Sequence, residues 1–196
     1  MAVNLTRIYT RTGDAGETRL GDNSSISKTD PRLAAYGEVD EANSHIGVAI
    51  AAGHLNSTLV VLLTRIQNDL FDVGADLCNP ITPNPEYPPL RITQEYVDRL
   101  ESWCDDYNGR LTKLRSFILP GGTEGAAYLN VARAVVRRAE RAGWAAVEAH
   151  GPSVNLLAIT YLNRLSDLLF ILGRVANLSS GGDVLWVPGG ERTPQP

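Results

Sequence analysis

The sequence has few of the side chains that most often mark redox or metal proteins. Its two cysteines, Cys78 and Cys104, stand far apart in the 196 residues and in no metal-like spacing, so we expect two free thiols in a reducing cytoplasm. The three histidines, His45, His54 and His150, are scattered. None belongs to the Glu-x-x-His pairs that di-iron helical bundles use. Metal redox chemistry through protein ligands is therefore not expected.

Long apolar runs and lysines are scarce as well. No uninterrupted apolar run approaches the roughly 18–20 residues of a membrane span, and no apolar segment precedes the first arginines as in a signal peptide. Lysine occurs only at positions 28 and 113, and the formal net charge is −4. A chain with this charge has no overall attraction for nucleic acid or anionic membranes. We expect a soluble, cytoplasmic protein that binds any anion through a local cluster of cations.

Several well-known catalytic signatures are also missing. There is no GxxxxGK[ST] segment, which excludes a P-loop NTPase, and no GxSxG, HExxH or paired CxxC. No Ser/His/Asp or Cys/His arrangement is visible, and no pair of carboxylates stands out as acid and base. The remaining polar groups suit binding and charge stabilisation better than proton transfer.

Helical patterns dominate what the sequence does contain. Five proline residues in NPITPNPEYPPL mark a loop, residues 111–123 look extended and end in a Pro-Gly-Gly turn, and residues 184–187 suggest a short strand. Apolar spacing and capping residues predict helices over residues 32–52, 57–78, 93–108, 125–149 and 153–179. The chain should therefore form one domain over residues 1–196, an all-α, antiparallel five-helix bundle of ferritin-like up-down architecture. An extended N-terminal loop (residues 1–30) and an exposed tail (residues 182–196) flank this bundle.

The N-terminal stretch IYTRTGDAGETRL gathers groups that suit a polyphosphate. Gly13 and Gly16 can take positive φ angles, which lets successive backbone N–H groups turn toward one point. Hydroxyl or cationic donors surround them: Thr10, Thr12, Thr18, Arg11, Arg19 and Lys28. The loop alone does not decide between a phosphate site and a mobile glycine-rich terminus.

A second cluster lies in the fourth predicted helix, VARAVVRRAERA. Arg133, Arg137, Glu140 and Arg141 recur at three- and four-residue spacing and so share one face. Arg138 is turned about 100° away from Arg137. Glu140 can orient neighbouring guanidinium groups through charge-assisted hydrogen bonds. The alternative is a charged face that is simply solvated.

A third cluster lies in the last predicted helix, YLNRLSDLLF. Asn163 and Asp167 stand one turn apart in an otherwise apolar run, and polar groups in such a helix need partners if they are buried. Local capping, or an ion pair with Arg164 or Arg174, is the alternative to a functional role. Asp40 in the first helix raises the same question, and an arginine is its expected partner.

Taken together, these segments resemble the PduO-type ATP:cob(I)alamin adenosyltransferases, also called corrinoid adenosyltransferases. The matching segments are IYTRTGDAGETRL, DPRLAAYGEVDEANSHIG, FILPGGTEGAAYLNVARAVVRRAER and YLNRLSDLLF, in the family's order. The resemblance implies a homotrimer with active sites between subunits. It implies transfer of the 5′-deoxyadenosyl group of ATP, with Mg²⁺, to the cobalt of cob(I)alamin, which gives adenosylcobalamin and tripolyphosphate. Transient partners would be a flavoprotein reductase and an adenosylcobalamin-dependent enzyme.

The resemblance also implies roles for individual residues. Phe117 would block the lower axial face of the corrinoid and so ease reduction of cob(II)alamin, and Asp167 matches the aspartate of the family's NRLSD segment. Asn163 would contact ATP and its Mg²⁺, and Asp40 and Arg133 would form a salt bridge between subunits. The ATP-binding residues would be Thr10, Arg11, Thr12, Gly13, Thr18, Arg19, Lys28, Arg137, Arg138, Glu140 and Arg141.

The chain departs from the usual family pattern at a few positions. It has DEANS where DELNS is common, LNVARA in place of LHVART, and LGR in place of AAR. Ala42 and Asn130 are therefore candidates for altered packing or affinity on the corrinoid side. Two rival functions are an inert bundle that carries or senses ATP or corrinoid, and ATP hydrolysis. The intact RRAER and NRLSD segments favour the transferase over a carrier, and no group is placed to activate water for hydrolysis.

Overall fold

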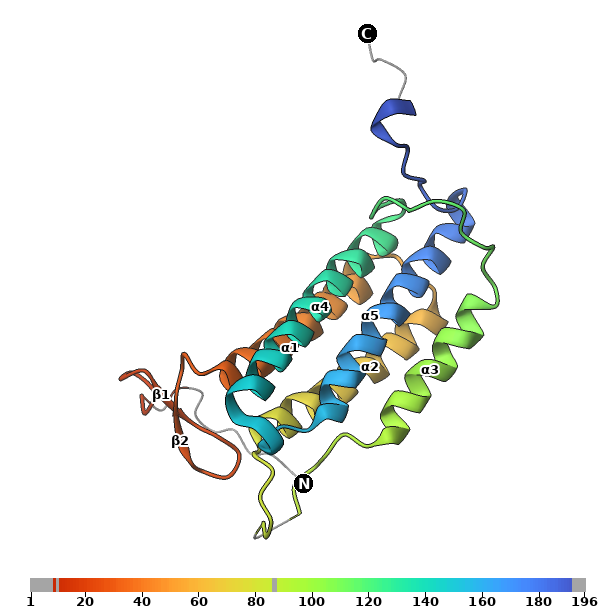
Figure 1. The fold of residues 1–196 in the computed structure, drawn as a ribbon. Coiled ribbons are helices and arrows are strands. Elements are labelled where there is room, and N and C mark those ends of the chain that lie inside the picture. The colour runs from red at the N-terminus through yellow and green to blue at the C-terminus, as the bar shows by residue number, and fades with distance from the viewer. Residues whose placement is uncertain (1–8, 10, 86–87, 192–196) are drawn as a thin grey trace.

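The protein is a bundle of α-helices with a small N-terminal hairpin. The computed structural model describes residues 9, 11–85 and 88–191. Its helices are α1 (Pro31–Ala52), α2 (Ser57–Cys78), α3 (Gln94–Asn108), α4 (Glu124–His150) and α5 (Leu156–Asn177). Consecutive helices run in opposite directions (Figure 1). The prediction of an all-α helical bundle is confirmed.

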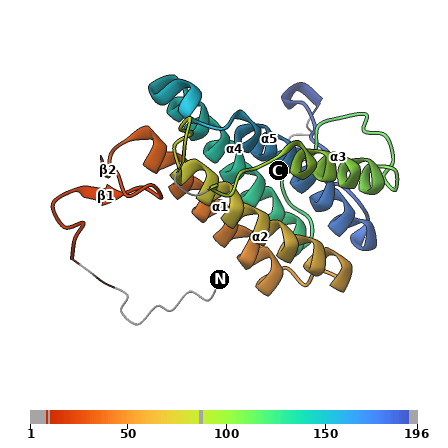
Figure 2. The ribbon, with the colours of Figure 1, turned by 90° about the horizontal axis from the view of Figure 1, so that it is seen from below.

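The helices form two layers with one helix outside. The long helix α4 packs on α1 and on α5, and α1 also packs on α2. The shorter helix α3 lies against α5 at the edge of the bundle, as the view from below shows (Figure 2). One layer therefore presents α4 and α5 outward, and the opposite layer presents α1 and α2.

Local capping explains where most of these helices begin. The side chains of Asp30, Asn56 and Thr123 accept hydrogen bonds from backbone N–H groups in the first turns of α1, α2 and α4, which satisfies donors that a helix start leaves unpaired. Asn155 does the same for α5 by accepting from the N–H of Leu157 at 3.0 Å. The sequence patterns did not identify Asn155 as a cap, and the predicted start of α5 at residue 153 is wrong, since the helix begins at Leu156. A 3₁₀ turn, η1 (Gly151–Ser153), occupies that place instead.

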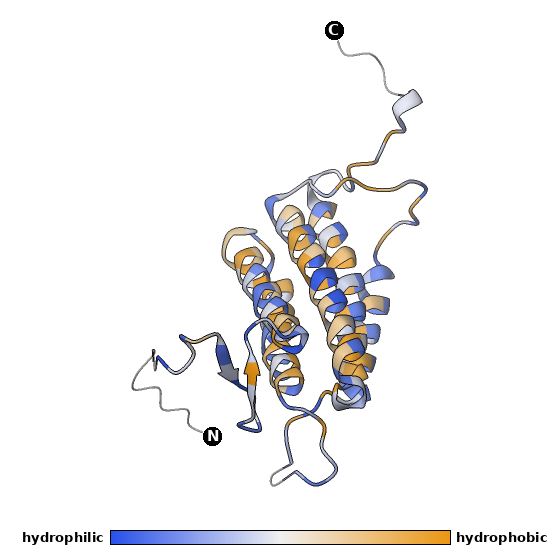
Figure 3. Ribbon diagram, turned by 60° about the vertical axis from the view of Figure 1, so that its left-hand side comes forward, coloured by the Kyte–Doolittle hydropathy of each residue, from blue (hydrophilic) through white to orange (hydrophobic). Residues whose placement is uncertain are grey.

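The core consists of the aliphatic stripes that the helices turn toward one another (Figure 3). On α2 the apolar residues at three- and four-residue spacing are all buried: Leu59, Leu62, Leu63, Ile66, Leu70, Val73 and Leu77. Helix α5 is apolar on most sides, and the segment Leu156–Ser180 is long and apolar enough to cross a membrane by length and composition. Of its most apolar 18-residue stretch, 56 % is buried within the bundle, and the buried core helix of a soluble protein can have the same length and composition.

One buried carboxylate ties the proline-rich loop to the bundle. Asp76 on α2 has a fully buried side chain, and its oxygens accept from Arg91 Nη1 at 2.6 Å, from Ile92 N at 2.7 Å and from Asn155 Nδ2 at 2.6 Å. The end of the loop and the cap of α5 therefore meet at one carboxylate. A buried charge of this kind is stable only while all its partners are present.

We predict that Asp76→Ala lowers the free energy of unfolding by about 3 kcal/mol, because Arg91 and the N–H of Ile92 lose their common acceptor. Urea denaturation followed by circular dichroism measures this change. Asp72→Ala, one turn earlier, is the control, since Asp72 accepts a single bond from the Tyr96 hydroxyl at 2.9 Å and should cost about 1 kcal/mol. Equal effects of the two changes would contradict the role of Asp76.

Candidate functional site

The outward face of α4 and α5 brings the second and third predicted clusters together. Asn163 Nδ2 on α5 donates to Glu140 Oε1 on α4 at 3.0 Å. The side-chain oxygen of Asn163, Oδ1, accepts from Arg164 Nη1 at 2.6 Å. Arg164 is also paired through Nε with Glu101 of α3 at 2.7 Å. The amide of Asn163 is thus held from both sides, and its oxygen retains a second lone pair for another donor or a cation.

Cations gather on the same face, one and two turns toward the start of α4. The Arg133 guanidinium lies 5.5 Å from the centroid of the Phe170 ring on α5. Burial lowers the pKa of Arg133, and the neighbouring charge of Arg137 lowers it further, while Asp167 opposes both effects. Arg137 is exposed, and no described side chain forms a hydrogen bond or ion pair with its guanidinium. The face therefore offers an unneutralised cation beside an ordered amide.

Asp167 also remains open on this face. Its side chain is exposed, and it forms no ion pair with Arg174, which is paired with Asp183 instead (Nε to Oδ2, 2.9 Å). The alternative of an ion pair between Asp167 and Arg174 is therefore wrong. The charge of Arg164 is near enough to interact with Asp167.

Arg138 points elsewhere, as its 100° rotation predicts. Its guanidinium pairs with Glu38 (Nε to Oε2, 2.5 Å) and with Glu41, both on α1. The hydrogen bonds that Arg138 donates to these carboxylates raise the pKa of Arg138, and Arg138 in turn lowers the pKa of Glu41. Arg138 thus joins α1 to α4 instead of lying with Arg137 and Asn163. The two glutamates are partners that the sequence analysis did not identify, although they stand one turn apart on α1.

The N-terminal segment folds into a hairpin that the sequence analysis did not predict. Strand β1 (Glu17–Arg19) pairs antiparallel with β2 (Ser25–Ser27), and the turn-forming run Gly-Asp-Asn-Ser between them was the available signal. Gly16 has φ +86°, and a side chain at Gly13 would lie 2.9 Å from Lys28 Nζ. The backbone therefore favours glycine at position 16, whereas a side chain at position 13 would displace the flexible end of Lys28 and crowd the Glu17 carbonyl at 3.1 Å.

A concave surface of about 710 Å³ opens on this hairpin. It collects the predicted donors that the structure describes: Arg11, Thr12, Gly13, Thr18, Arg19 and Lys28. Thr10 lies outside the described residues. Asp14 and Glu17 line the same surface, so a polyanion would need a counter-ion or would displace these carboxylates. Among the described residues, no hydrogen bond or ion pair links the hairpin to the α4–α5 face.

Phe117 lies on the loop between α3 and α4 and is 77 % exposed. Its ring meets the Trp186 ring edge-on at a centroid distance of 5.9 Å, and its carbonyl accepts from Trp186 N at 2.8 Å. Ile118 and Leu185 form an isolated β-bridge, so the expected strand over residues 184–187 is reduced to one bridging pair. The tail is therefore paired with the Phe117 loop. The local sequence patterns of the two segments did not predict this contact.

Asp40 and Arg133 do not meet within the chain. Asp40 is exposed and lines a groove between α1 and α2, together with Phe71, which is 71 % exposed. Arg133 contacts α5 in the other layer. A bond between these two residues therefore requires a second copy of the chain.

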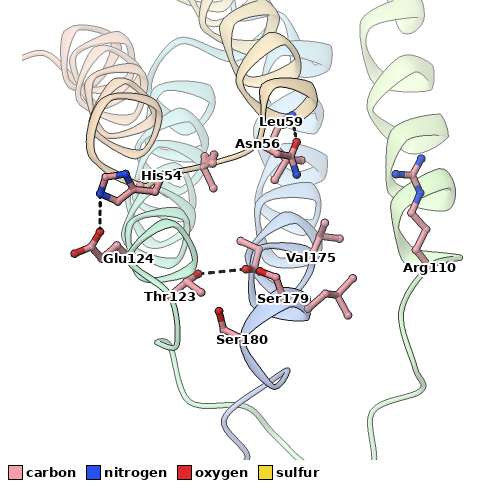
Figure 4. Close-up of a pocket in the computed structure, with 13 residues that line it drawn as sticks. His54, Asn56, Leu59, Arg110, Thr123, Glu124, Val175, Ser179 and Ser180 are labelled. Atoms are coloured by element: carbon pink, nitrogen blue, oxygen red, sulfur yellow. Dashed lines mark hydrogen bonds and ion pairs between the residues drawn. The ribbon is translucent and has the colours of Figure 1, made fainter.

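Another polar cavity, of about 700 Å³, opens where α1 ends and α4 begins (Figure 4). His54 and Glu124 point toward each other there, with Nε2 and Oε2 3.2 Å apart, and both side chains are largely exposed. None of the predicted site residues lines this cavity. Among the described residues, no cluster of three or more His, Cys, Asp or Glu side chains could hold a metal ion.

The fold and these clusters define a helical bundle with two cationic, donor-rich surfaces of the kind that bind phosphate groups. Comparison with known proteins identifies its family. A family model described as cobalamin adenosyltransferase matches residues 8–176, so the chain belongs to the cobalamin adenosyltransferase family, and its sequence and structural relatives place it with the PduO-type members.

The relatives cover nearly the whole chain. A corrinoid adenosyltransferase of Mycobacterium tuberculosis is 63 % identical over 193 residues, which are 98 % of this chain and 99 % of the relative. One of Bacillus subtilis is 40 % identical, with 91 % of each chain covered. A variant PduO-type ATP:corrinoid adenosyltransferase from Lactobacillus reuteri, solved in complex with cobalamin and ATP, has 37 % identity and a TM-score of 0.84. The match covers 92 % of this chain and 99 % of that one.

Proposed function

We propose that the protein transfers the 5′-deoxyadenosyl group of ATP to the cobalt of cob(I)alamin, with release of tripolyphosphate. The observation that carries this proposal is the α4–α5 face, where the free guanidinium of Arg137 lies on the same helix face as Glu140, which binds Asn163. Its relative from Lactobacillus reuteri binds cobalamin and ATP.

The chemistry requires no general base. Cob(I)alamin is itself a strong nucleophile, so the cobalt attacks the ribose C5′ while the C5′–O bond to the triphosphate breaks and its electron pair leaves with the triphosphate. The protein must align the two substrates and stabilise the negative charge on the leaving group. The positive charge of Arg137 on α4 would provide this stabilisation, and the hairpin donors would hold the phosphates from the other side.

The ATP would carry Mg²⁺, and the residues present fit that ion. Mg²⁺ prefers oxygen ligands and usually keeps only one or two from the protein. The carbonyl oxygen of Asn163 has a free lone pair, and Glu140 lies beside it. Asn163 would therefore hold the ion, and the phosphates would complete its ligands and be neutralised by it.

We further propose a homotrimer in which each active site uses two subunits. Asp40 and Arg133 lie in opposite layers, and Phe71 leaves an exposed ring beside Asp40. A head-to-tail contact between such different faces closes into a ring when the rotation permits. The donors of one hairpin and the α4–α5 face of the neighbouring subunit would then enclose the nucleotide, which accounts for their separation within one chain.

A charge exchange tests this contact. We expect Asp40→Arg to weaken each interface by about 2 kcal/mol or more, because two guanidinium groups then face each other. Light scattering after size exclusion should show smaller species, and the double variant Asp40→Arg with Arg133→Asp should restore the trimer. The same loss with Ser44→Arg, one turn further along α1, would show that any added charge breaks the assembly and that the pair has no special role.

Phe117 would face the lower side of the corrinoid and keep its lower ligand away, which eases reduction of cob(II) to cob(I). The exposure of its ring, which leaves it available to a ligand, supports this role. The electron would come from a transient flavoprotein reductase in the cytoplasm, and the product would pass to an adenosylcobalamin-dependent enzyme.

The function is tested by mixing the protein with ATP, Mg²⁺ and chemically reduced cobalamin. The visible spectrum should change to that of adenosylcobalamin, with one tripolyphosphate released per corrinoid adenosylated. Release of orthophosphate without a spectral change would indicate ATP hydrolysis, and binding without either product would indicate a carrier.

A further inference from the structure

The loop that carries Phe117 differs in charge from the rest of the chain. Residues 108–123 hold Arg110, Lys113 and Arg115 and no aspartate or glutamate, whereas the whole chain has a net charge of −4. All three cationic side chains are exposed. A local positive field of this kind attracts an anion that the protein as a whole would repel.

Part of this loop lines an open cavity of about 550 Å³ against α5. Thr112, Lys113 and Leu114 line it from the loop, and Asp167, Phe170 and Arg174 line it from α5. Its wall is largely apolar, since Leu111 and Ile171 contribute as well. The cavity could therefore accept a group that has both an aromatic or aliphatic part and an anionic part.

Arg174 fixes the shape of this cavity and does not supply its free charge. Its Nη2 donates to the carbonyl of Thr112 at 2.9 Å, and its Nε is paired with Asp183 at 2.9 Å. The side chains of this pair are only 5 % and 13 % exposed. Arg174 is thus neutralised, and it holds the loop to α5.

Lys113 is in the opposite situation. It is exposed at the cavity, and no described residue forms an ion pair or hydrogen bond with its ammonium group. An ammonium group donates up to three hydrogen bonds and is a strong point charge for a phosphate. Lys113 is therefore the cation of this cavity that is available to a ligand.

We propose that Lys113 binds the phosphodiester of the nucleotide arm of cobalamin, and that the cavity beside it receives this arm. The inference rests on the proposed function, which places the lower face of the corrinoid at Phe117. Most of the corrin periphery carries neutral amides, and the fixed anion of cobalamin is the phosphodiester that links the ring to its lower base. When a phenylalanine excludes the base from cobalt, the arm must leave the lower face. Lys113, four residues before Phe117, lies within about 14 Å along the chain.

The test compares cobalamin with cobinamide, which has the same ring but lacks the nucleotide arm and its phosphodiester. The cob(II) form of each is titrated into the ATP-loaded protein, and the dissociation constant is read from the visible spectrum. We expect Lys113→Ala to weaken cobalamin binding about two- to fivefold, the range of an exposed ion pair, and to leave cobinamide binding unchanged. Lys113→Arg should restore cobalamin binding, and added salt should weaken it more than cobinamide binding.

Arg110→Ala is the matched control, because it removes a cation from the same loop. Its guanidinium stacks on Tyr107 at 4.6 Å from the ring centroid, and it lines the other cavity at the end of the bundle. This variant should keep the wild-type ratio of cobalamin to cobinamide affinity.

Two results would overturn the role of Lys113: equal losses with both corrinoids, or unchanged affinities with a rate that falls only when a protein reductant supplies the electron. The latter would make the loop a docking surface for an acidic protein. If the wild-type protein binds neither corrinoid, the proposed function itself fails, and this outcome is distinct from the other two.

Discussion

Arg137→Ala is expected to lower the rate of adenosyl transfer by about 100- to 1,000-fold while the bundle stays folded. That is the usual cost of removing one group that stabilises charge in a transition state. The Arg137 side chain is exposed and has no partner among the described side chains, so its loss leaves no buried group unsatisfied. The rate is followed at the absorbance of adenosylcobalamin with saturating, chemically reduced corrinoid.

Three accompanying measurements make the result specific. Arg137→Lys keeps the charge but loses the planar fork, so it should recover part of the rate. Arg65→Ala removes an exposed arginine from α2, where it stacks on Trp103 at 5.6 Å, and should keep wild-type turnover. The melting temperature of Arg137→Ala should match that of the wild type. Full turnover in Arg137→Ala would contradict the proposal that Arg137 stabilises the charge of the leaving triphosphate.

Phe117→Ala is expected to abolish most formation of four-coordinate cob(II)alamin while ATP still binds. Burial of one phenyl group against an apolar surface is worth about 1.5–3 kcal/mol, so the yield should fall at least about tenfold. Electron paramagnetic resonance of cob(II)alamin with the ATP-loaded protein reports the number of axial ligands. Calorimetric titration with ATP reports the nucleotide site separately.

Leu119→Ala is the control for Phe117→Ala, since it removes an exposed apolar side chain from the same loop. Leu119 is 45 % exposed, and its contact with the tail is the backbone bond from its N–H to the carbonyl of Val184 at 2.8 Å. This bond survives the substitution, so the four-coordinate signal should persist. An undiminished signal in Phe117→Ala would count against a role at the lower face.

The spacing of apolar residues, together with breaking and capping residues, was sufficient to predict the helices, because both are properties of the segment itself and most helices carry their own cap. The start of α5 was the exception. Asn155 serves α5 both as a cap and, through Nδ2, as a partner of Asp76, and Asp76 lies 79 residues earlier in the chain. The hairpin was missed for a related reason. Three-residue strands have too little periodicity to stand out from a loop.

The site was predicted less evenly than the fold. The resemblance to the family supplied most of the candidate residues, and helical spacing correctly separated Arg137 from Arg138. Spacing did not indicate that Glu38 and Glu41 hold Arg138, or that Trp186 lies against Phe117. These contacts join segments about 70 to 100 residues apart, and no local pattern encodes which distant segment becomes a neighbour.

The sequence by itself determined the helices, the loop donors and the arginine-rich face, because local propensity and side-chain periodicity are properties of short segments. Only the tertiary structure decided which of these charges are already neutralised. Arg174 and Arg138 found carboxylates on other segments, whereas Arg137 and Lys113 found none among the described residues. A cation's availability depends on the charges that packing brings within a few ångströms, and that distance is fixed by the bundle.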